Sequence, residues 1–247
     1  MPGIITLLTD FGTRDSYVAE VKGVIATKAH GVVLIDVTHD LAPGDLPAAR
    51  YLLARTWHRF PAGTVHLAVV DPGVGTARRA IAAEAGGHYF VAPDNGLLSP
   101  LPRDARFVEL PVPEHAAPTF HARDVFAPVA AQLTNGTALT HLGQVIHDPE
   151  RVAIPGPRRD GAVWVGEVVY VDRFGTLMTN IPGELVRPGV GLRVGERDVG
   201  AVRRTFGDVA PGQLVSLVGS NGSVEIAVRE GSAAELLGVG VGVEVRA

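Results

Sequence analysis

The chain has 247 residues, of which 46% are hydrophobic, and a formal net charge of −4 at pH 7. This length allows one large domain or two smaller ones. A run of about 18 apolar residues, as a membrane span needs, is missing, and the first apolar stretch is too short for a signal peptide. The absence of cysteine excludes disulfides and a thiol nucleophile. The charge has no like-sign blocks, so it gives no reason to expect nucleic acid as a partner. We therefore expect a cytoplasmic protein that acts on a small molecule.

The first half of the chain alternates short apolar runs with helical patterns. The runs typical of strands are residues 4–9, 32–37, 65–70 and 88–92. Helical spacing of apolar residues marks 16–27 and 46–59. Strands interleaved with helices predict parallel βαβ units. Residues 1–156 are thus expected to form an α/β domain, with a mostly parallel sheet flanked by helices.

The character of the sequence changes after a segment rich in proline, glycine and arginine at residues 155–159. Short β-like segments separated by glycine and proline turns then follow at 162–171, 191–194, 213–218, 223–228 and 241–245. One helix is expected at 232–237. Residues 157–247 are therefore predicted to form a smaller antiparallel β-barrel domain.

Carboxylates stand at the ends of the apolar runs in the first half: Asp10, Asp36 with Asp40, Asp71 and Asp94. The carboxyl ends of parallel strands meet at one edge of a sheet, where open α/β folds bind their ligands. Aspartate is also a common turn and N-cap residue, which explains any one of these positions equally well. Because four runs end in this way, a ligand site at this edge is as good an explanation as four separate turns.

The segment DPGVGTARR at residues 71–79 carries the carboxylate of Asp71 and the guanidinium groups of Arg78 and Arg79. Its glycines allow the backbone to approach a ligand closely. It is not a P-loop, because no GK[ST] follows, and it lacks the third glycine of a dinucleotide fingerprint. A salt-bridged turn without a catalytic role is the alternative interpretation.

His121 lies in TFHARDVFAP, where polar groups interrupt an apolar sequence and a helix is expected to begin. The other histidines that we considered are interpreted as structural, whereas His121 adjoins Arg123 and Asp124. In the second half, the segments at 171–181 and 219–226 place polar residues at tight glycine turns. Such turns can present backbone groups to a planar base, or they can be plain hairpins, and spacing alone does not decide.

These segments together resemble the S-adenosylmethionine hydrolases, or hydroxide adenosyltransferases, which are relatives of the fluorinases and chlorinases. The matching stretches run from residue 9 to residue 227 and are TDFGTRDSYVAEVKG, VDPGVGTARR, APDNGLL, TFHARDVFAP, VDRFGTLMTNI and GSNGSVEIA. The resemblance implies an N-terminal α/β domain joined to a C-terminal β-barrel. It also implies a homotrimer whose active sites lie between the N-terminal domain of one subunit and the C-terminal domain of the next.

The resemblance further implies a catalytic triad of Asp71, Arg78 and His121 that handles the attacking water. The halogenating relatives lack this triad, so its presence favours water over halide as the nucleophile. The substrate-binding residues implied in the same way are Asp10, for the ribose hydroxyls, and Asp172, Phe174, Thr176, Ser220, Asn221, Glu225 and Val228, for the adenine and the amino-acid end.

Two positions depart from the family pattern. Thr176 stands where the family usually has asparagine, which shortens a side-chain amide contact to a hydroxyl. Ala122 stands where the family usually has glycine, which adds a methyl group near the expected nucleophile. Both changes bear on how the substrate fits, and neither removes the triad.

The expected reaction is hydrolysis of S-adenosyl-L-methionine to adenosine and L-methionine by attack of activated water at C5′. The R-sulfonium epimer, whose clearance would suit such an enzyme, is a candidate substrate. Neither a metal nor an organic cofactor is expected, because side chains are assigned to activate the water. One alternative is a metal-dependent hydrolase, for which the candidate ligands are Asp10, Asp40, Asp71, His121 and Asp124. Another alternative is a non-catalytic adenosine-binding protein.

Overall fold

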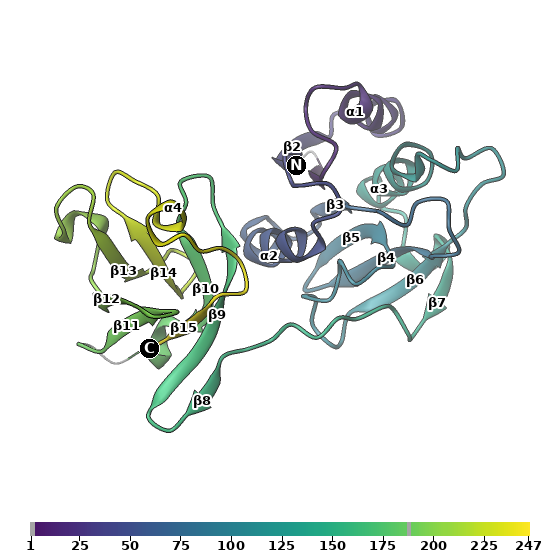
Figure 1. Cartoon of the computed structure of the whole chain (residues 1–247). Coiled ribbons are helices and arrows are strands. Elements are labelled where there is room, and N and C mark those ends of the chain that lie inside the picture. Colours follow the sequence, from purple (N-terminus) through teal and green to yellow (C-terminus); the bar gives the residue numbers. More distant parts are fainter. Residues whose placement is uncertain (1–2, 187–188) are drawn as a thin grey trace. The chain divides into compact units, whose positions relative to one another are not determined.

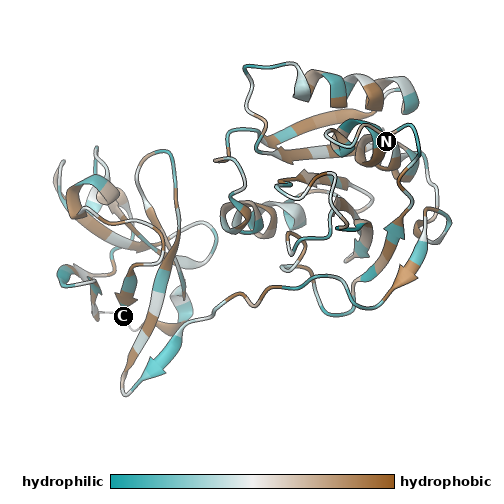
Figure 2. Cartoon of the chain, turned by 45° about the vertical axis from the view of Figure 1, so that its right-hand side comes forward, coloured by the Kyte–Doolittle hydropathy of each residue, from teal (hydrophilic) through white to brown (hydrophobic). Residues whose placement is uncertain are grey.

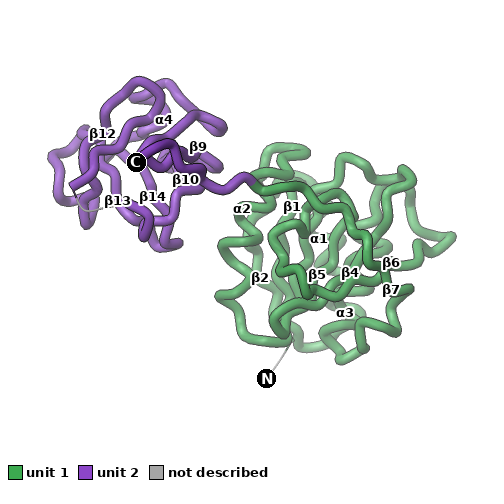
Figure 3. Tube along the Cα trace, turned by 90° about the horizontal axis from the view of Figure 1, so that it is seen from below, with its two compact units in different colours: residues 1–154 green, residues 155–247 purple. Residues whose placement is uncertain are grey.

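The computed structural model describes residues 3–186 and 189–247. The chain divides into two compact units, Met1–Ile154 and Pro155–Ala247, which appear in different colours in Figure 3. Each unit carries its own sheet, with seven strands in the first and eight in the second (Figure 1). The predicted fold class, an α/β unit followed by an antiparallel barrel-like unit, is confirmed. None of the helices in the described part of the chain has the length and apolarity needed to span a bilayer.

The sheet of the first unit is mixed, with the strand order β2-β1-β3-β5-β4-β6-β7. Its strands are β1 (Ile4–Thr9), β2 (Val33–Thr38), β3 (Val65–Val69), β4 (Ala80–Ala85), β5 (His88–Pro93), β6 (Arg106–Leu110) and β7 (Gln144–Ile146). Neighbours from β2 to β5 run parallel. From β5 through β4 and β6 to β7 the pairing is antiparallel. The parallel half corresponds to the predicted βαβ units, and the antiparallel half extends the sheet beyond them.

Helices cover both faces of this sheet. They are α1 (Tyr17–Lys28), α2 (Leu46–Thr56), which continues into a 3-10 turn at Trp57–Arg59, and α3 (Ala127–Thr134), which follows a π-helix at Ala122–Phe126; a further 3-10 turn spans Leu139–His141. Successive side chains of a strand point to opposite faces. Ile5 and Leu7 of β1 accordingly pack with the core residues of α1 and α3. Thr6, between them, faces His66, whose neighbour His88 contacts Trp57 on the other side.

The strand β4 was not predicted from its sequence, AIAAEA. Alanine is the best helix former, and the segment has a single β-branched residue, so its local preference opposes a strand. Tertiary context overrides that preference, because β4 lies between β5 and β6 with most of its side chains buried. A small side chain suits a strand covered on both faces.

The second unit forms a nearly closed antiparallel sheet with the order β12-β11-β15-β9-β10-β14-β13, and β8 pairs with β9. Its elements are β8 (Arg158–Asp160), β9 (Val163–Val171), β10 (Leu177–Pro182), β11 (Gly191–Val194), β12 (Arg197–Ala201), β13 (Leu214–Val218), β14 (Ser223–Val228), α4 (Ala233–Leu237) and β15 (Glu244–Arg246), with 3-10 turns at Gly183–Leu185 and Phe206–Asp208. The two ends of the sheet approach where Arg203 bridges to Leu217. The inner face holds apolar side chains such as Val168, Leu177 and Ile226.

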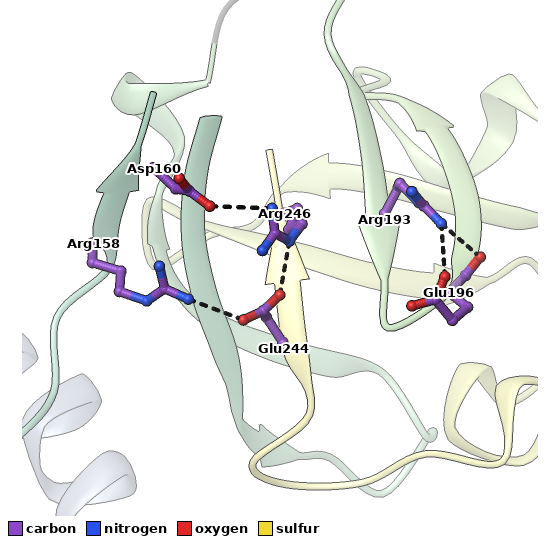
Figure 4. Close-up of polar contacts among 6 residues, drawn as sticks. All are labelled: Arg158, Asp160, Arg193, Glu196, Glu244 and Arg246. Atoms are coloured by element: carbon purple, nitrogen blue, oxygen red, sulfur yellow. Dashed lines mark hydrogen bonds and ion pairs between the residues drawn. The ribbon is translucent and has the colours of Figure 1, made fainter. Parts of the chain in front are cut away.

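Exposed ion pairs fasten the short strands on the outside of this barrel. Glu244 accepts from Arg158 at 3.2 Å and from Arg246 at 2.7 Å, and Arg246 reaches Asp160 at 3.4 Å (Figure 4). This network joins β8 to β15 across β9, and the hydrophilic β8 is teal in Figure 2. Exposed pairs of this kind stabilise a fold only slightly, so the barrel depends on its apolar core.

Candidate active site

The ends of three neighbouring parallel strands supply carboxylates to one edge of the first sheet. Asp10 follows β1, Asp71 comes two residues after β3, and Asp94 follows β5. Thr9 pairs with Val69, so Asp10 and Asp71 leave the sheet side by side. Asp10 is held by a hydrogen bond in which the backbone N–H of Gly44 donates to its Oδ2 at 2.7 Å.

Arg78 joins Asp71 to His121. Its Nε donates to Oδ1 of Asp71 at 2.9 Å, and its Nη2 donates to Oδ2 of the same carboxylate. The same Nη2 lies 3.1 Å from Nδ1 of His121. The three groups are largely withdrawn from solvent, with side-chain exposures of 4% for Asp71 and 9% for Arg78, and 7% for the His121 residue. Bidentate contacts of this type fix geometry as well as charge.

The contact between Arg78 and His121 determines where the imidazole carries its proton. A guanidinium group donates hydrogen bonds and accepts none, so Nδ1 of His121 is the acceptor and the proton sits on Nε2. Burial lowers the pKa of His121 below its ordinary value, and the positive charge of Arg78 lowers it further, against the opposing effect of Asp71 and Asp124. His121 is therefore a neutral imidazole that offers its Nε2–H as a donor.

The loop that carries Arg78 touches the segment that leads to His121. Gly75 has a φ of +77°, and a Cβ at this position would lie 2.7 Å from the carbonyl oxygen of Pro118. Only glycine fits such an approach in a left-handed backbone conformation. The close approach of Gly75 to Pro118 places the loop that carries Arg78 beside the segment that carries His121.

Asp94, the third carboxylate at this edge, is engaged in a structural contact. Its Oδ2 accepts from Nε of Arg79 at 2.8 Å, and its Oδ1 accepts from the backbone N–H of Glu150 at 2.7 Å. Arg79 also reaches the side chain of Asp148 at 2.9 Å. The two arginines of the 71–79 loop thus have different partners. Arg78 contacts the imidazole of His121, and Arg79 binds the segment after β7.

The expectation that Asp36 ends a strand was wrong, because Asp36 lies inside β2 and pairs with Leu7. Its carboxylate accepts from Nζ of Lys22 at 2.7 Å and lies 3.1 Å from Nε2 of His39. The strand continues to Thr38, so the side chain of Asp36 lies on a face of the sheet and not at the edge formed by the carboxyl ends of the strands. Asp40, two residues beyond the strand, is exposed.

His39 is a residue that the sequence analysis missed. It is buried, its Nδ1 lies 2.7 Å from Oγ1 of Thr9, and its carbonyl oxygen accepts from the backbone N–H of Gly12 at 2.7 Å. These contacts hold both sides of Asp10. The sequence offered one signal for His39, its position between the two aspartates of LIDVTHD, but the interpretation of that segment considered only the carboxylates.

In the second unit, Asp172 organises the turn between β9 and β10. Its Oδ1 accepts from the backbone N–H groups of Phe174 at 2.9 Å and Thr176 at 2.8 Å. Phe174 is 76% exposed, whereas Thr176 is buried. The turn is therefore a well-defined hairpin that leaves one aromatic side chain on the surface.

The remaining residues implied by the resemblance lie on β14 or on the turn before it. Ser220 and Asn221 occupy the exposed turn after β13, Glu225 is buried opposite Met178, and Val228 packs in the barrel core. Because β10 and β14 are antiparallel, the 172–176 turn and the 219–222 turn lie at opposite ends of this strand pair. The candidate residues of the second unit thus form two groups, with Glu225 between them.

The two departures from the family pattern fall at buried positions. Ala122 is 4% exposed and belongs to the core of the first unit, so its methyl group packs against apolar neighbours. Thr176 is 7% exposed and contributes its backbone N–H to the Asp172 turn. Among the residues that the structure describes, no three His, Asp or Glu side chains gather as metal ligands.

Comparison with known proteins finds relatives that match both units of the chain. Residues 5–143 match the family model of the SAM hydroxide adenosyltransferase N-terminal domain, and residues 166–246 match that of the C-terminal domain. The chain is 44% identical to proteins named (R)-S-adenosyl-L-methionine hydrolase from Thermus thermophilus, over 98% of both chains, and from Salinispora tropica, over 98% of this chain and 96% of that one. It is also similar to the crystal structure of an uncharacterized conserved protein from Thermotoga maritima, with a TM-score of 0.90 and 37% identity over 98% of both chains. The chain therefore belongs to the SAM hydroxide adenosyltransferase family.

Proposed function

We propose that this protein hydrolyses S-adenosyl-L-methionine to adenosine and L-methionine, with the R-sulfonium epimer as a substrate. The observation that carries the proposal is the buried contact of Arg78 with both Asp71 and His121. Family membership and the names of the relatives at 44% identity support the same reaction and the same epimer.

The chemistry of the substrate suits a site without a strong acid. The water oxygen forms a bond to C5′ of the ribose while the C5′–S bond breaks, and the sulfur keeps the bonding electron pair. Methionine leaves as a neutral thioether, so the leaving group needs no proton, and the one proton that the attacking water loses passes to solvent water once the C5′–O bond has formed. Since the approaching oxygen gains negative character next to a sulfonium cation, a preorganised and dry site favours the transition state.

Each residue of the triad then has a separate task. Arg78 and the Nε2–H of His121 donate hydrogen bonds to the water oxygen, which aligns it behind the C5′–S bond and stabilises hydroxide character. Asp71 accepts two hydrogen bonds from Arg78, so it fixes the plane of the guanidinium group and balances its charge. The lowered pKa of His121 keeps the imidazole neutral at pH 7, which preserves its Nδ1 as an acceptor for Arg78.

Asp10 is proposed to bind the ribose hydroxyls from the neighbouring strand end. Asp172, Phe174, Thr176, Ser220, Asn221, Glu225 and Val228 are proposed to contact the adenine and the amino-acid end. Val228 would do so through its backbone, because its side chain packs in the barrel core. A homotrimer is also proposed, in which the barrel unit of one subunit completes the site on the α/β unit of the next.

The decisive experiment is chromatography of purified protein incubated with each separated sulfonium epimer, with and without chloride. Adenosine as the sole nucleoside product is expected, and Arg78→Ala and His121→Ala should abolish most of its release while substrate binding stays detectable. 5′-Chloro-5′-deoxyadenosine would overturn the choice of water as nucleophile. Near wild-type turnover in either variant would overturn the triad assignment.

The same preparation separates the two alternative functions. Full activity after chelation excludes a metal-dependent hydrolase, whereas strict dependence on added metal would replace the proposal with it. Tight adenosine binding by calorimetry without any product from either epimer would select the non-catalytic binding protein. For the homotrimer, mixing Arg78→Ala with Glu225→Ala subunits should restore activity if each site takes residues from two subunits.

A further inference from the structure

His121 stands at the start of an unusual backbone feature. It caps a five-residue π-helix, Ala122–Phe126, which runs directly into α3. A π-turn widens the helix and leaves backbone hydrogen bonds less regular, so it needs support from side chains, and such turns occur frequently at functional sites. Arg123 and Asp124, the two residues that follow Ala122, provide this support.

Asp124 closes the segment around His121. Its Oδ2 accepts from the backbone N–H of Ala117 at 2.9 Å, and the backbone N–H of Asp124 donates to the carbonyl oxygen of Phe120 at 3.2 Å. These two bonds join residues before His121 to a residue after it. The pKa of Asp124 is lowered chiefly by its hydrogen bonds to Arg123, so this carboxylate is an anion at pH 7.

Arg123 connects the same segment to α1. Its Nε and Nη2 donate to the two oxygens of Asp124 at 2.7 and 2.9 Å, and its Nη1 donates to Oε2 of Glu20 at 2.9 Å. The guanidinium group also lies 4.9 Å from the ring centre of Phe120, the residue before His121. One planar group thereby holds both flanks of the histidine against a neighbouring helix, which a lysine cannot reproduce.

We propose that Arg123, with Asp124 and Glu20, is a positioning residue that keeps the imidazole of His121 within hydrogen-bonding distance of Arg78; this inference rests on the proposed function. None of the bonds made by Arg123 that the structure describes reaches Asp71, Arg78 or His121, so its effect passes through the backbone at residues 117–124. Loosening this segment allows Nδ1 of His121 to move away from Nη2 of Arg78. The donor Nε2–H then loses its alignment with the water.

The test is Arg123→Gln in the full-length protein, with two independent readouts. The first is steady-state kinetics, where kcat should fall by about tenfold or more with KM changed by less than about threefold, since the loss concerns the transition state. The second is the titration of His121 followed by NMR of its imidazole and assigned with His121→Gln. The pKa of His121 should rise, because burial and then the charge of Arg78 hold it down in the native arrangement.

Three variants complete the design. Arg123→Lys should recover part of kcat, because it keeps a cation beside Asp124 but loses the bidentate contact. Glu20→Ala, at a partly exposed position, should shift both readouts in the same direction by less, and it replaces Arg123→Gln as the test if that variant fails to fold. Arg106→Gln removes an exposed arginine paired with Glu84 in the same unit, and should leave both readouts unchanged.

The outcomes distinguish this inference from the proposed function. Wild-type kcat together with an unmoved pKa of His121 in Arg123→Gln overturns the positioning role, even if the melting temperature falls. If the wild-type protein releases no adenosine, the proposed function is overturned, whereas the NMR titration still tests whether Arg123 holds His121 beside Arg78. A raised pKa in the absence of turnover would support the structural link alone.

Discussion

Nη2 of Arg78 lies 3.1 Å from Nδ1 of His121 while the same guanidinium group donates two hydrogen bonds to Asp71. This contact assigns the imidazole proton to Nε2, since arginine has no acceptor to offer. The carboxylate, the guanidinium and the imidazole therefore act as one unit, in which a change at Asp71 is felt at His121 through Arg78.

Asp71→Asn should lower kcat by about 100-fold, because its amide nitrogen is a donor that would face the donors of Arg78. The variant keeps the shape of the side chain, so substrate binding should change little. The measurement is kcat and KM for adenosine release. Asp148→Asn is the matched control, because this exposed carboxylate also pairs with an arginine of the same loop, and it should behave as the wild type. Equal kcat in the two variants would refute the coupling.

The activity should depend on pH through His121. Burial and then the charge of Arg78 hold its pKa below the ordinary value of 6.5, so the fall of kcat with falling pH should have its midpoint below pH 6.5. Protonation at Nδ1 would place an N–H against the N–H of Arg78, which breaks the contact. A pH–rate profile measured at saturating substrate checks this. A midpoint above pH 6.5, or a decline that persists in the residual activity of His121→Gln, would contradict the assignment.

Gly75→Ala should lower both stability and turnover. The φ of +77° disfavours any Cβ, and the 2.7 Å approach to the carbonyl oxygen of Pro118 requires the 71–79 loop to shift away from the His121 segment. Gly63→Ala is the matched control, since its φ is +86° and a Cβ there meets nothing within 4 Å. Both variants should lose about 1 kcal/mol from backbone strain, and only Gly75→Ala should lose kcat. Unchanged turnover in Gly75→Ala would show that the loop contact does not serve the site.

Gly219→Ala should raise the KM for the substrate. A Cβ at residue 219 would lie 1.8 Å from Oε1 of Glu225, so the buried carboxylate must move from its place beside the β13–β14 turn. Gly240→Ala is a suitable control in the same unit, because a Cβ there meets nothing within 4 Å. Calorimetric titration with the substrate and steady-state kinetics both report the change. An unaltered KM would remove Glu225 from the proposed binding set.

Local patterns in the sequence predicted the parallel half of the first sheet, because β1, β2 and β3 alternate with the helices α1 and α2. They missed β4, where alanine favours a helix and only the neighbours β5 and β6 impose a strand. They also missed the π-turn after His121, which the ion pairs of Arg123 and Asp124 support. Features that depend on contacts distant in the sequence have no local signature.

The same limit applies to the candidate site. Asp71 and His121 are 50 positions apart in the sequence, and no periodicity brings them together; the resemblance alone selected the pair. His39 was overlooked because its role depends on contacts with Thr9 and Gly12, which join the end of β2 to the end of β1 and the loop that follows it.

A buried pair of histidines should make the first unit sensitive to acid. His66 is 1% exposed, its Nδ1 lies 2.8 Å from Oγ1 of Thr6, and its Nε2 lies 3.2 Å from Nδ1 of His88. Burial, followed by the charge of His88, lowers the pKa of His66 to about 3. Between that value and the ordinary value of 6.5, the unfolded chain binds a proton that the folded chain does not, so stability falls as the pH falls through this window.

Urea unfolding at pH 7 and pH 5 measures this effect. His66 alone should reduce the free energy of unfolding by about 2 kcal/mol between the two conditions, since each unit of pKa difference corresponds to about 1.4 kcal/mol. His88, whose pKa burial also lowers, adds to the loss with the same sign. The double variant Thr6→Val/His66→Phe removes the titrating ring together with its hydroxyl partner, so it should lose that part of the pH dependence. If wild type and variant weaken equally between pH 7 and pH 5, His66 is not the group responsible.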